Sequence, residues 1–194
     1  FSEKPIRHIG IVGRISPEKG QDVLPHLALQ FPELTFHVLG DSAFSDRQYE
    51  ERLRAAAPDN IIFHGWVENL PAKVDEIGLQ ICLAPSRCPE SSPGRSFEAA
   101  PLVPLQMVAL GCMVAVRSLG SLEYLARELS LPTFEEDQDI HACLQTILQM
   151  PTHQLSQKCQ QGYTTVMAQY SHDAFQQRLR SLLTDVCGVQ TTIW

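Results

Sequence analysis

The amino-acid sequence predicts an α/β protein with a doubly wound parallel sheet of about six strands, followed by a helical tail. Two observations lead to this fold class. Short, β-rich apolar runs alternate with longer segments of helical periodicity, and beyond about residue 137 the pattern is helical only. Strands that are apolar throughout and separated by single helices are typical of parallel sheets that helices cover on both faces.

The predicted elements follow in chain order, and the strands are bounded by Gly, Pro or Asp, which favour turns. The predicted strands cover residues 6–13, 34–40, 60–65, 79–85 and 112–118. The predicted helices cover residues 20–31, 45–57, 69–78, 101–111 and 120–129. A last helix is predicted over about 171–187, because Ser171 can cap its first turn and Asp173 favours the helix dipole.

Composition and charge exclude several classes of protein. The chain has 194 residues, 44% of them hydrophobic, and its net charge of −7 argues against a nucleic-acid-binding protein. The six cysteines form no Cys-x-x-Cys pair and the seven histidines no His-x-x-x-His pair, so neither a disulfide framework nor a metal site is predicted. We therefore expect a reduced, cytoplasmic chain without a membrane-spanning segment. Since the sequence opens on Phe, we also expect it to be part of a longer protein.

The segment "GRISPEKG", residues 13–20, follows the first predicted strand and holds two cations, Arg14 and Lys19. It is not a P-loop, because Glu18 stands where that motif has glycine and Gly20 where it has a hydroxyl residue. It also lacks the glycine spacing of the dinucleotide fingerprint. The two cations are therefore either solvated loop residues or ligands of another kind of anion.

The place of this segment in the predicted sheet favours the second interpretation. Ligands of open parallel sheets bind beyond the carboxyl ends of the strands, where the strand order reverses. Residues 13–20 follow the first predicted strand, and residues 84–101 follow the fourth. Both segments therefore belong to the ligand-binding edge, and we expect Arg14 and Lys19 to face a bound anion.

Several collinear segments resemble the nucleotide-binding domain of retaining GT-B glycosyltransferases. That family includes sucrose synthases and bacterial glycolipid mannosyltransferases, with glycogen synthases as relatives. "GRISPEKGQDVL" resembles the family's "GR-L-PEKG-D-L", and "LVPLQMVALGCMVAVRSLGSLEYL" is similar to "LVPLEAMACGTPVVAS-VGGLPEV". "LTFHVLGD", "NIIFHGWVENLPAKVDEIGLQICLAPS" and "YSHDAFQQRLRSLL" resemble further segments of the family in the same order. The resemblance implies a Rossmann-like domain that forms one half of a GT-B fold.

This resemblance also implies a domain organisation and a reaction. Residues 1–150 form the donor-nucleotide-binding domain, and residues 151–194 form helices that pack on it and toward an N-terminal acceptor domain. In such enzymes the arginine and lysine of the loop neutralise the donor diphosphate, so Arg14 and Lys19 are predicted to be catalytic and donor-binding residues. Fixed cations stabilise a leaving nucleoside diphosphate without a metal. The implied reaction transfers a sugar from a UDP-, GDP- or ADP-sugar to a glycan, lipid or small-molecule acceptor, with no cofactor.

The resemblance further limits what this chain does alone. Its acceptor domain is not in the sequence, so we expect the isolated chain to bind a nucleotide sugar and to transfer none. Any peripheral membrane contact would belong to that other domain. Asp137–Asp139 has the Asp-x-Asp spacing of metal-dependent transferases, and we interpret it as an exposed acidic stretch.

The family's second signature is a Glu-x7-Glu motif, whose first glutamate meets the donor sugar and whose second binds the ribose. Aligned backward from "VALG", Glu98 takes the first position and Gln106 the second. Gln106 is neutral and loses a charge-assisted hydrogen bond. Pro101 replaces the usual glycine and removes one N–H, whereas Leu102 and Val103 keep theirs at a helix start suited to anions. The resemblance thus adds Glu98 to the predicted catalytic residues Arg14 and Lys19, with Leu102, Val103 and Gln106 binding the donor.

Aligned forward from "LAPS", the same motif falls on Glu90 and Glu98 instead, so an insertion lies between Ser86 and Leu102. We prefer Glu98 with Gln106, because the downstream match continues without a gap. The departures from the motif also leave a second function open, a non-catalytic GT-B-like module that binds a partner or serves as a structural domain. A flavodoxin-like or response-regulator-like domain is disfavoured, because the chain lacks the early acidic cluster of such domains.

Overall fold

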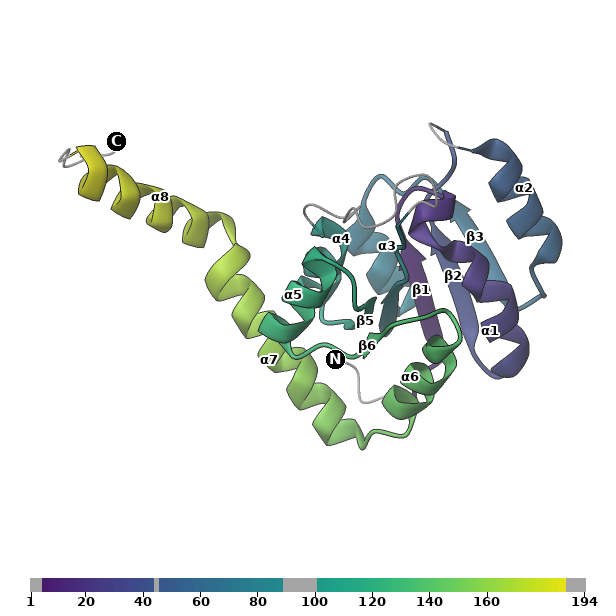
Figure 1. Cartoon of the computed structure of the whole chain (residues 1–194). Helices are drawn as coiled ribbons and strands as arrows, with labels where there is room; N and C mark the ends of the chain where they lie inside the picture. The colour runs from purple at the N-terminus through teal and green to yellow at the C-terminus, as the bar shows by residue number, and fades with distance from the viewer. Residues whose placement is uncertain (1–4, 44–45, 89–100, 188–194) are drawn as a thin grey trace.

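Figure 1 shows the computed structural model of the chain, which describes residues 5–43, 46–88 and 101–187. The described residues form one parallel, six-stranded sheet in the order β3-β2-β1-β4-β5-β6. The strands are β1 (His8–Val12), β2 (Thr35–Leu39), β3 (Ile61–Gly65), β4 (Ile81–Ala84), β5 (Met113–Arg117) and β6 (Thr133–Phe134). This is the Rossmann order of a doubly wound sheet, and it confirms the predicted fold class.

Helices flank the sheet and enclose two apolar clusters. They are α1 (Leu24–Gln30), α2 (Arg47–Ala56), α3 (Leu70–Ile77), α4 (Leu102–Ala109), α5 (Ser121–Leu129), α6 (Asp139–Leu148), α7 (Thr152–Tyr170) and α8 (His172–Cys187). One cluster of buried side chains joins the sheet to α1, α2 and α6, and the other joins it to α3, α4 and α5. The predicted strands and helices are all present. Helices α6 and α7 fall in the region beyond residue 137 that was predicted only as helical, without separate bounds. β6 was not predicted, because a strand of two residues shows no periodic pattern.

Polar residues fix where three of the described helices begin, and one of these caps, Ser171, was predicted from the sequence. Asp46 and Asn69 cap α2 and α3, since each side chain accepts a hydrogen bond of 3.1 Å from the backbone N–H three residues later. Ser171 accepts a hydrogen bond of 3.2 Å from the N–H of Ala174 at the start of α8, which confirms its predicted role.

The C-terminal helices differ in how they meet the rest of the domain. Helix α7 contacts α4, α5 and β5, and Gly162 lets it approach α4 so closely that a Cβ there would lie 3.1 Å from Val108. Helix α8 follows α7 directly, contacts it, and extends away from the sheet (Figure 1). Large apolar side chains of α8 are exposed, namely Phe175, Leu179, Leu182 and Leu183. Among the described helices, none has the length and apolar character needed to cross a bilayer.

We predict that α8 exchanges its amide hydrogens quickly in this chain and slowly when an N-terminal acceptor domain is joined to it. An amphipathic helix gains most of its stability from packing its apolar face, and that face is exposed here. Hydrogen exchange followed by mass spectrometry measures both states, with α7 as the internal reference. Full protection of α8 in the chain by itself would contradict the prediction.

Candidate functional site

The carboxyl edge of the sheet brings the two predicted ligand segments together. β1 and β4 are neighbours, and the chain proceeds from them in opposite directions, toward β3 and toward β6. The loop after β1 meets the segment after β4 at this point, where the N–H of Arg87 donates to the carbonyl of Glu18 at 2.9 Å. Helix α4 begins at the same edge, since it connects β4 to β5. The arrangement is the switch point at which doubly wound sheets bind ligands.

The loop after β1 is held in one conformation by a buried glutamine. Gln21 is fully buried; its amide nitrogen donates to the carbonyl of Arg14 at 2.8 Å, and its amide oxygen accepts from the N–H of Ser16 at 3.3 Å. These bonds satisfy backbone groups that the loop could not pair within a strand or helix. Gln21 was not among the predicted site residues, because a glutamine beside a helix start is ordinary on a protein surface.

Arg14 lies on this loop in an ion pair. Its guanidinium contacts the carboxylate of Glu18 at 2.7 Å, and the Arg14 side chain is 45% exposed. Exposed pairs of this kind contribute at most about 1 kcal/mol. That Arg14 faces a bound anion stays a prediction.

Lys19 lies deeper in the switch point. A cavity of about 20 Å³ separates the ends of β1 and β4 from the start of α4. Its described lining includes Lys19, Ser86 and Val103, whereas Arg14 is not part of it. A cavity of this size holds about one water molecule, so it marks where the three segments meet and does not enclose a ligand. The structure thus brings Lys19 and Val103 together across the switch point.

The first turn of α4 offers two backbone donors. Pro101 and Pro104 have no N–H, so the orphan amides of this turn are those of Leu102 and Val103. Gln106 is exposed on the next turn and lies on the same side of the helix as Leu102, four residues earlier. The predicted donor-binding residues of α4 are therefore placed at the carboxyl edge.

The predicted glutamates of the motif, Glu90 and Glu98, lie outside the described residues. The choice between the two alignments, Glu98 with Gln106 or Glu90 with Glu98, therefore stays a prediction. No described group of three His, Cys, Asp or Glu side chains is placed to hold a metal ion.

The acidic stretch that was interpreted as solvated has a structural role at Asp137. Its carboxylate is only half exposed; it pairs with Arg117, which is buried at the end of β5, and contacts Arg87 at 3.2 Å. The interpretation as a mere surface stretch is therefore incomplete. These pairs could not be found from the sequence, because the residues are far apart along the chain: Arg87 follows β4, Arg117 ends β5 and Asp137 follows β6.

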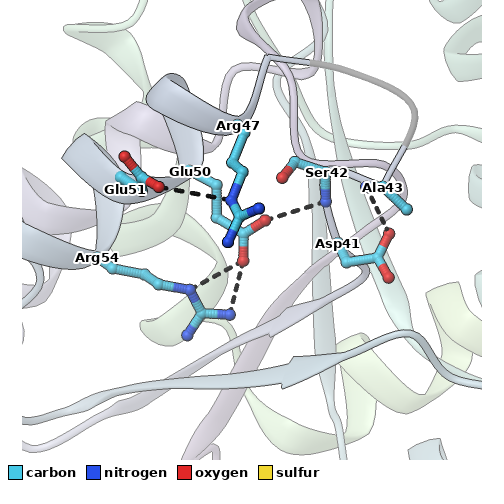
Figure 2. A pocket seen from close by; sticks show the side chains of 7 residues that line it. All are labelled: Asp41, Ser42, Ala43, Arg47, Glu50, Glu51 and Arg54. Atoms are coloured by element: carbon cyan, nitrogen blue, oxygen red, sulfur yellow. Dashed lines mark hydrogen bonds and ion pairs between the residues drawn. The ribbon is translucent and has the colours of Figure 1, made fainter.

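A larger hollow of about 510 Å³ lies at the carboxyl end of β2, and its charges are paired internally (Figure 2). Glu50 accepts from the N–H of Ser42 at 3.0 Å and contacts Arg54 at 2.7 Å, and Asp41 accepts from the N–H of Ala43 at 3.1 Å. Burial alone would raise the pKa of Glu50, but the bonds from Ser42 and Arg54 outweigh it and lower that pKa. These contacts tie α2 to the end of β2, and we assign no diphosphate to this hollow.

Three histidines form a hydrogen-bonded row across the sheet, away from the switch point. His8 Nδ1 lies 3.0 Å from His37 Nε2, and His37 Nδ1 lies 2.9 Å from His64 Nε2. Burial and the neighbouring His64 and His8 lower the pKa of His37 to about 4. Burial and Lys73 also lower the pKa of His64. The row was not predicted, since its members stand far apart in the sequence and only the strand register aligns them.

Known structures share this architecture. HepE of Anabaena, solved with UDP and glucose, superposes with a TM-score of 0.77 at 18% identity over 94% of this chain and 49% of its own. Sucrose-phosphate synthase of Thermosynechococcus elongatus gives 0.75 at 18% identity over 94% and 46%. The C-terminal domain of LpcC, a group 1 glycosyl transferase of Francisella tularensis, gives 0.63 at 22% identity over 86% and 87%. The chain therefore spans about half the length of the first two proteins.

These likenesses establish the fold, a Rossmann-like α/β domain that matches one half of a GT-B fold. No curated protein sequence matches the chain. The model of the family described as glycosyl transferases group 1 matches residues 6–153, which is more than half of the sequence. The matched region contains the whole sheet and every described residue of the switch point. The chain therefore belongs to the group 1 glycosyl transferases.

Proposed function

We propose that this chain is the donor-binding half of a metal-independent, retaining glycosyltransferase that uses a nucleotide sugar. The observation that carries the proposal is the meeting of Lys19 and the first turn of α4 at the switch point of the sheet, with Arg14 on the same loop as Lys19. Two cations and two orphan amides there suit a diphosphate. The acceptor, a glycan, a lipid or a small molecule, would be held by an N-terminal domain.

The chemistry proposed for these groups is electrostatic. When the sugar–phosphate bond breaks, negative charge grows on the leaving nucleoside diphosphate. Fixed cations and amide dipoles stabilise that charge without having to reorient, so they lower the barrier more than mobile water would. Arg14, Lys19 and the amides of Leu102 and Val103 take this role in the proposal. Glu98 is proposed to face the donor sugar, as the family motif implies.

The first donor to test is a UDP-sugar. Structures of HepE contain UDP-glucose or UDP, and HepE shares the fold of this chain. GDP- and ADP-sugars are the other arms of the test, since a diphosphate site does not by itself select a base. We expect one of the three nucleotides to raise the melting temperature of the chain, and we expect no sugar transfer by the chain alone, because catalysis requires both reactants in one cleft.

Replacing Arg14 or Lys19 with alanine is expected to weaken UDP binding by about 1–3 kcal/mol, the range for hydrogen bonds to charged groups. Uridine, which carries no phosphate, should bind each variant as it binds the unchanged chain. Calorimetry with both ligands measures the difference. Arg127→Ala is the matched control, because Arg127 is an exposed arginine in the last turn of α5 and does not belong to the candidate site. Equal losses for UDP and uridine would refute the assigned role.

A non-catalytic module is the second candidate. It is favoured by Gln106, a neutral residue that stands, in the preferred alignment, where the family motif has its second glutamate. A module that has lost the donor site should bind none of the three nucleotides, while the exposed face of α8 would still engage a partner domain. The same thermal-shift series separates the two functions. Nucleotide binding that depends on Arg14 or Lys19 supports the transferase.

Changing Gln106 to glutamate is expected to tighten UDP binding by about 1 kcal/mol or to leave it unchanged. A carboxylate forms stronger bonds to ribose hydroxyls, and the cost of desolvating it offsets part of the gain. Gln106→Ala should weaken UDP binding and should affect a dideoxyribose nucleotide less. The measurement is a titration of both nucleotides against the two variants. If the hydroxyl-dependent loss appears with Glu98→Ala and not with Gln106→Ala, the pair is Glu90 with Glu98.

A further inference from the structure

The loop that carries Arg14 and Lys19 is fastened to the segment after β4 on both sides of Lys19. On one side, the carbonyl of Glu18 accepts from the N–H of Arg87 at 2.9 Å. On the other, Gly20 has a φ of +72° and packs so closely on Pro85 that a Cβ would lie 2.6 Å from its carbonyl oxygen. Any side chain at residue 20 would push the two segments apart. The position of the Lys19 backbone is therefore set by the position of the segment Pro85–Arg87.

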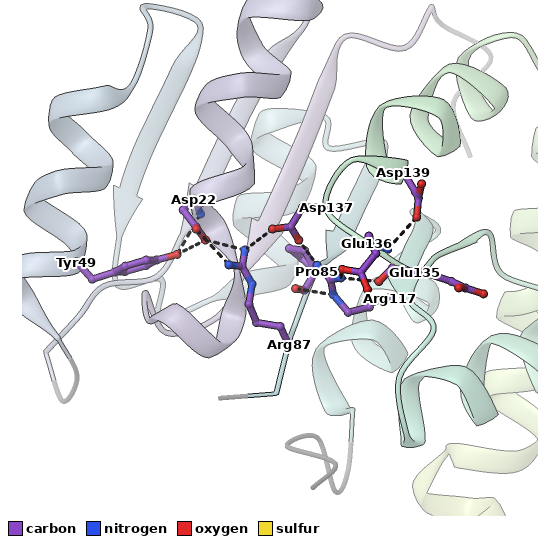
Figure 3. Close-up of polar contacts among 9 residues, drawn as sticks. All are labelled: Asp22, Tyr49, Pro85, Arg87, Arg117, Glu135, Glu136, Asp137 and Asp139. Carbon is purple, nitrogen blue, oxygen red and sulfur yellow. Dashed lines mark hydrogen bonds and ion pairs between the residues drawn. The ribbon is translucent and has the colours of Figure 1, made fainter. Parts of the chain in front are cut away.

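The side chain of Arg87 makes a second connection between the same segments (Figure 3). Its two terminal nitrogens contact both carboxylate oxygens of Asp22, at 2.9 and 3.2 Å. Asp22 directly follows the loop, in the short 3₁₀ turn Gln21–Val23. A bidentate arginine–carboxylate pair fixes direction as well as distance, which a single ion pair does not.

Both ends of this pair are anchored elsewhere in the domain. The hydroxyl of Tyr49 donates to Asp22 at 2.7 Å, and burial together with this bond raises the pKa of Tyr49, so the hydroxyl stays a donor. Arg87 also contacts Asp137 at 3.2 Å, and Asp137 pairs with the buried Arg117. Arg87 thereby links the connections after β1, β4 and β6, as Figure 3 shows.

We propose that Arg87 is a positioning residue: through Asp22 and the Glu18 carbonyl it holds the loop after β1 so that Lys19 faces the donor diphosphate. The inference rests on the proposed function. Arg87 does not itself contact the diphosphate in this arrangement. Two carboxylates already occupy its terminal nitrogens, and they would repel a second anion.

The test uses UDP and uridine, titrated against Arg87→Ala, Asp22→Ala and the double variant. UDP affinity should fall about tenfold for Arg87→Ala, an effect within the coupling range of residues in one network. Uridine affinity should stay unchanged, because the loop is proposed to contact the phosphates and uridine has none. The double variant should lose little more than either single variant, since both changes break the same pair. Arg87→Lys should keep part of the affinity, and Arg127→Ala should keep all of it.

The outcomes separate this inference from the proposed function. If the unchanged chain binds none of UDP, GDP and ADP, the proposed function is wrong, and the inference, which rests on it, is wrong as well. If the unchanged chain binds UDP and both single variants bind it equally well, only the inference fails. Additive losses in the double variant, or equal losses of UDP and uridine, would also overturn it, because a general loosening of the fold would produce them. Melting temperatures of every variant are measured alongside, and Arg87→Lys serves where Arg87→Ala does not fold.

Discussion

Replacing Gly40 with alanine is expected to lower the free energy of unfolding by about 3 kcal/mol or more, from strain and overpacking together. Gly40 follows β2 with a φ of +145°, which side chains rarely adopt. A Cβ there would lie 2.0 Å from the carbonyl oxygen of Gly13. The obstacle is backbone at the start of the loop that carries Arg14, so no rotamer change relieves it. Urea unfolding followed by circular dichroism measures the loss.

Gly65→Ala and Gly78→Ala are the matched controls for this experiment. Both glycines have a positive φ, +67° and +70°, but a Cβ on either meets no atom within 4 Å. Each control should therefore cost only the backbone term, about 1–2 kcal/mol. Gly40→Ala should in addition weaken UDP binding, because the displaced carbonyl belongs to the loop after β1. A loss for Gly40→Ala no larger than for Gly65→Ala would contradict the contact with Gly13.

The chain is expected to lose about 3 kcal/mol of stability through His37 as the pH falls from 7 to 4. The pKa of His37 is about 4 in the folded chain against 6.5 for an ordinary histidine. Between these values the unfolded chain binds more protons than the folded chain, so acid favours unfolding. Above pH 7 the group is neutral in both states and adds no pH dependence. The lowered pKa of His64 acts in the same direction.

Unfolding in urea at half-unit intervals of pH measures this slope. Carboxylates whose pKa is lowered, such as Glu50, also lose stability in acid, so the comparison is with His37→Gln. That variant should show a shallower slope between pH 6.5 and 4, whatever its stability at pH 7. His26→Gln is the control, because His26 is exposed and lies outside the row. A slope for His37→Gln equal to that of the unchanged chain would refute the assignment.

Local patterns account for most of what the sequence predicted correctly. Apolar runs bounded by turn residues located β1 to β5, because a strand buried on both faces must be apolar along its whole length. Ser171 marked the start of α8, because a capping side chain acts on its own helix. The segment "GRISPEKG" was placed at the carboxyl edge, because every parallel strand ends at that edge. The resemblance to GT-B glycosyltransferases came from the order of such segments, and the match to the group 1 family model confirms it.

Contacts between segments that are distant in the sequence could not be predicted from such local patterns. The pair of Arg14 and Glu18 could have been found, since the residues are four apart and oppositely charged. The row of His8, His37 and His64 could not, because its members meet only through the register of three strands.

The sequence by itself therefore determined the class of fold, the elements in order, the family and the loop at the ligand edge. These properties depend on periodicity and on signals within a few residues, which can be recognised without knowing which distant segments each residue contacts. The tertiary structure alone decided that Arg87 joins Asp22 to Asp137, that Gln21 fixes the loop, and that Gly40 must lack a side chain. These properties depend on which connections the strand order β3-β2-β1-β4-β5-β6 places side by side, and no local pattern encodes that order.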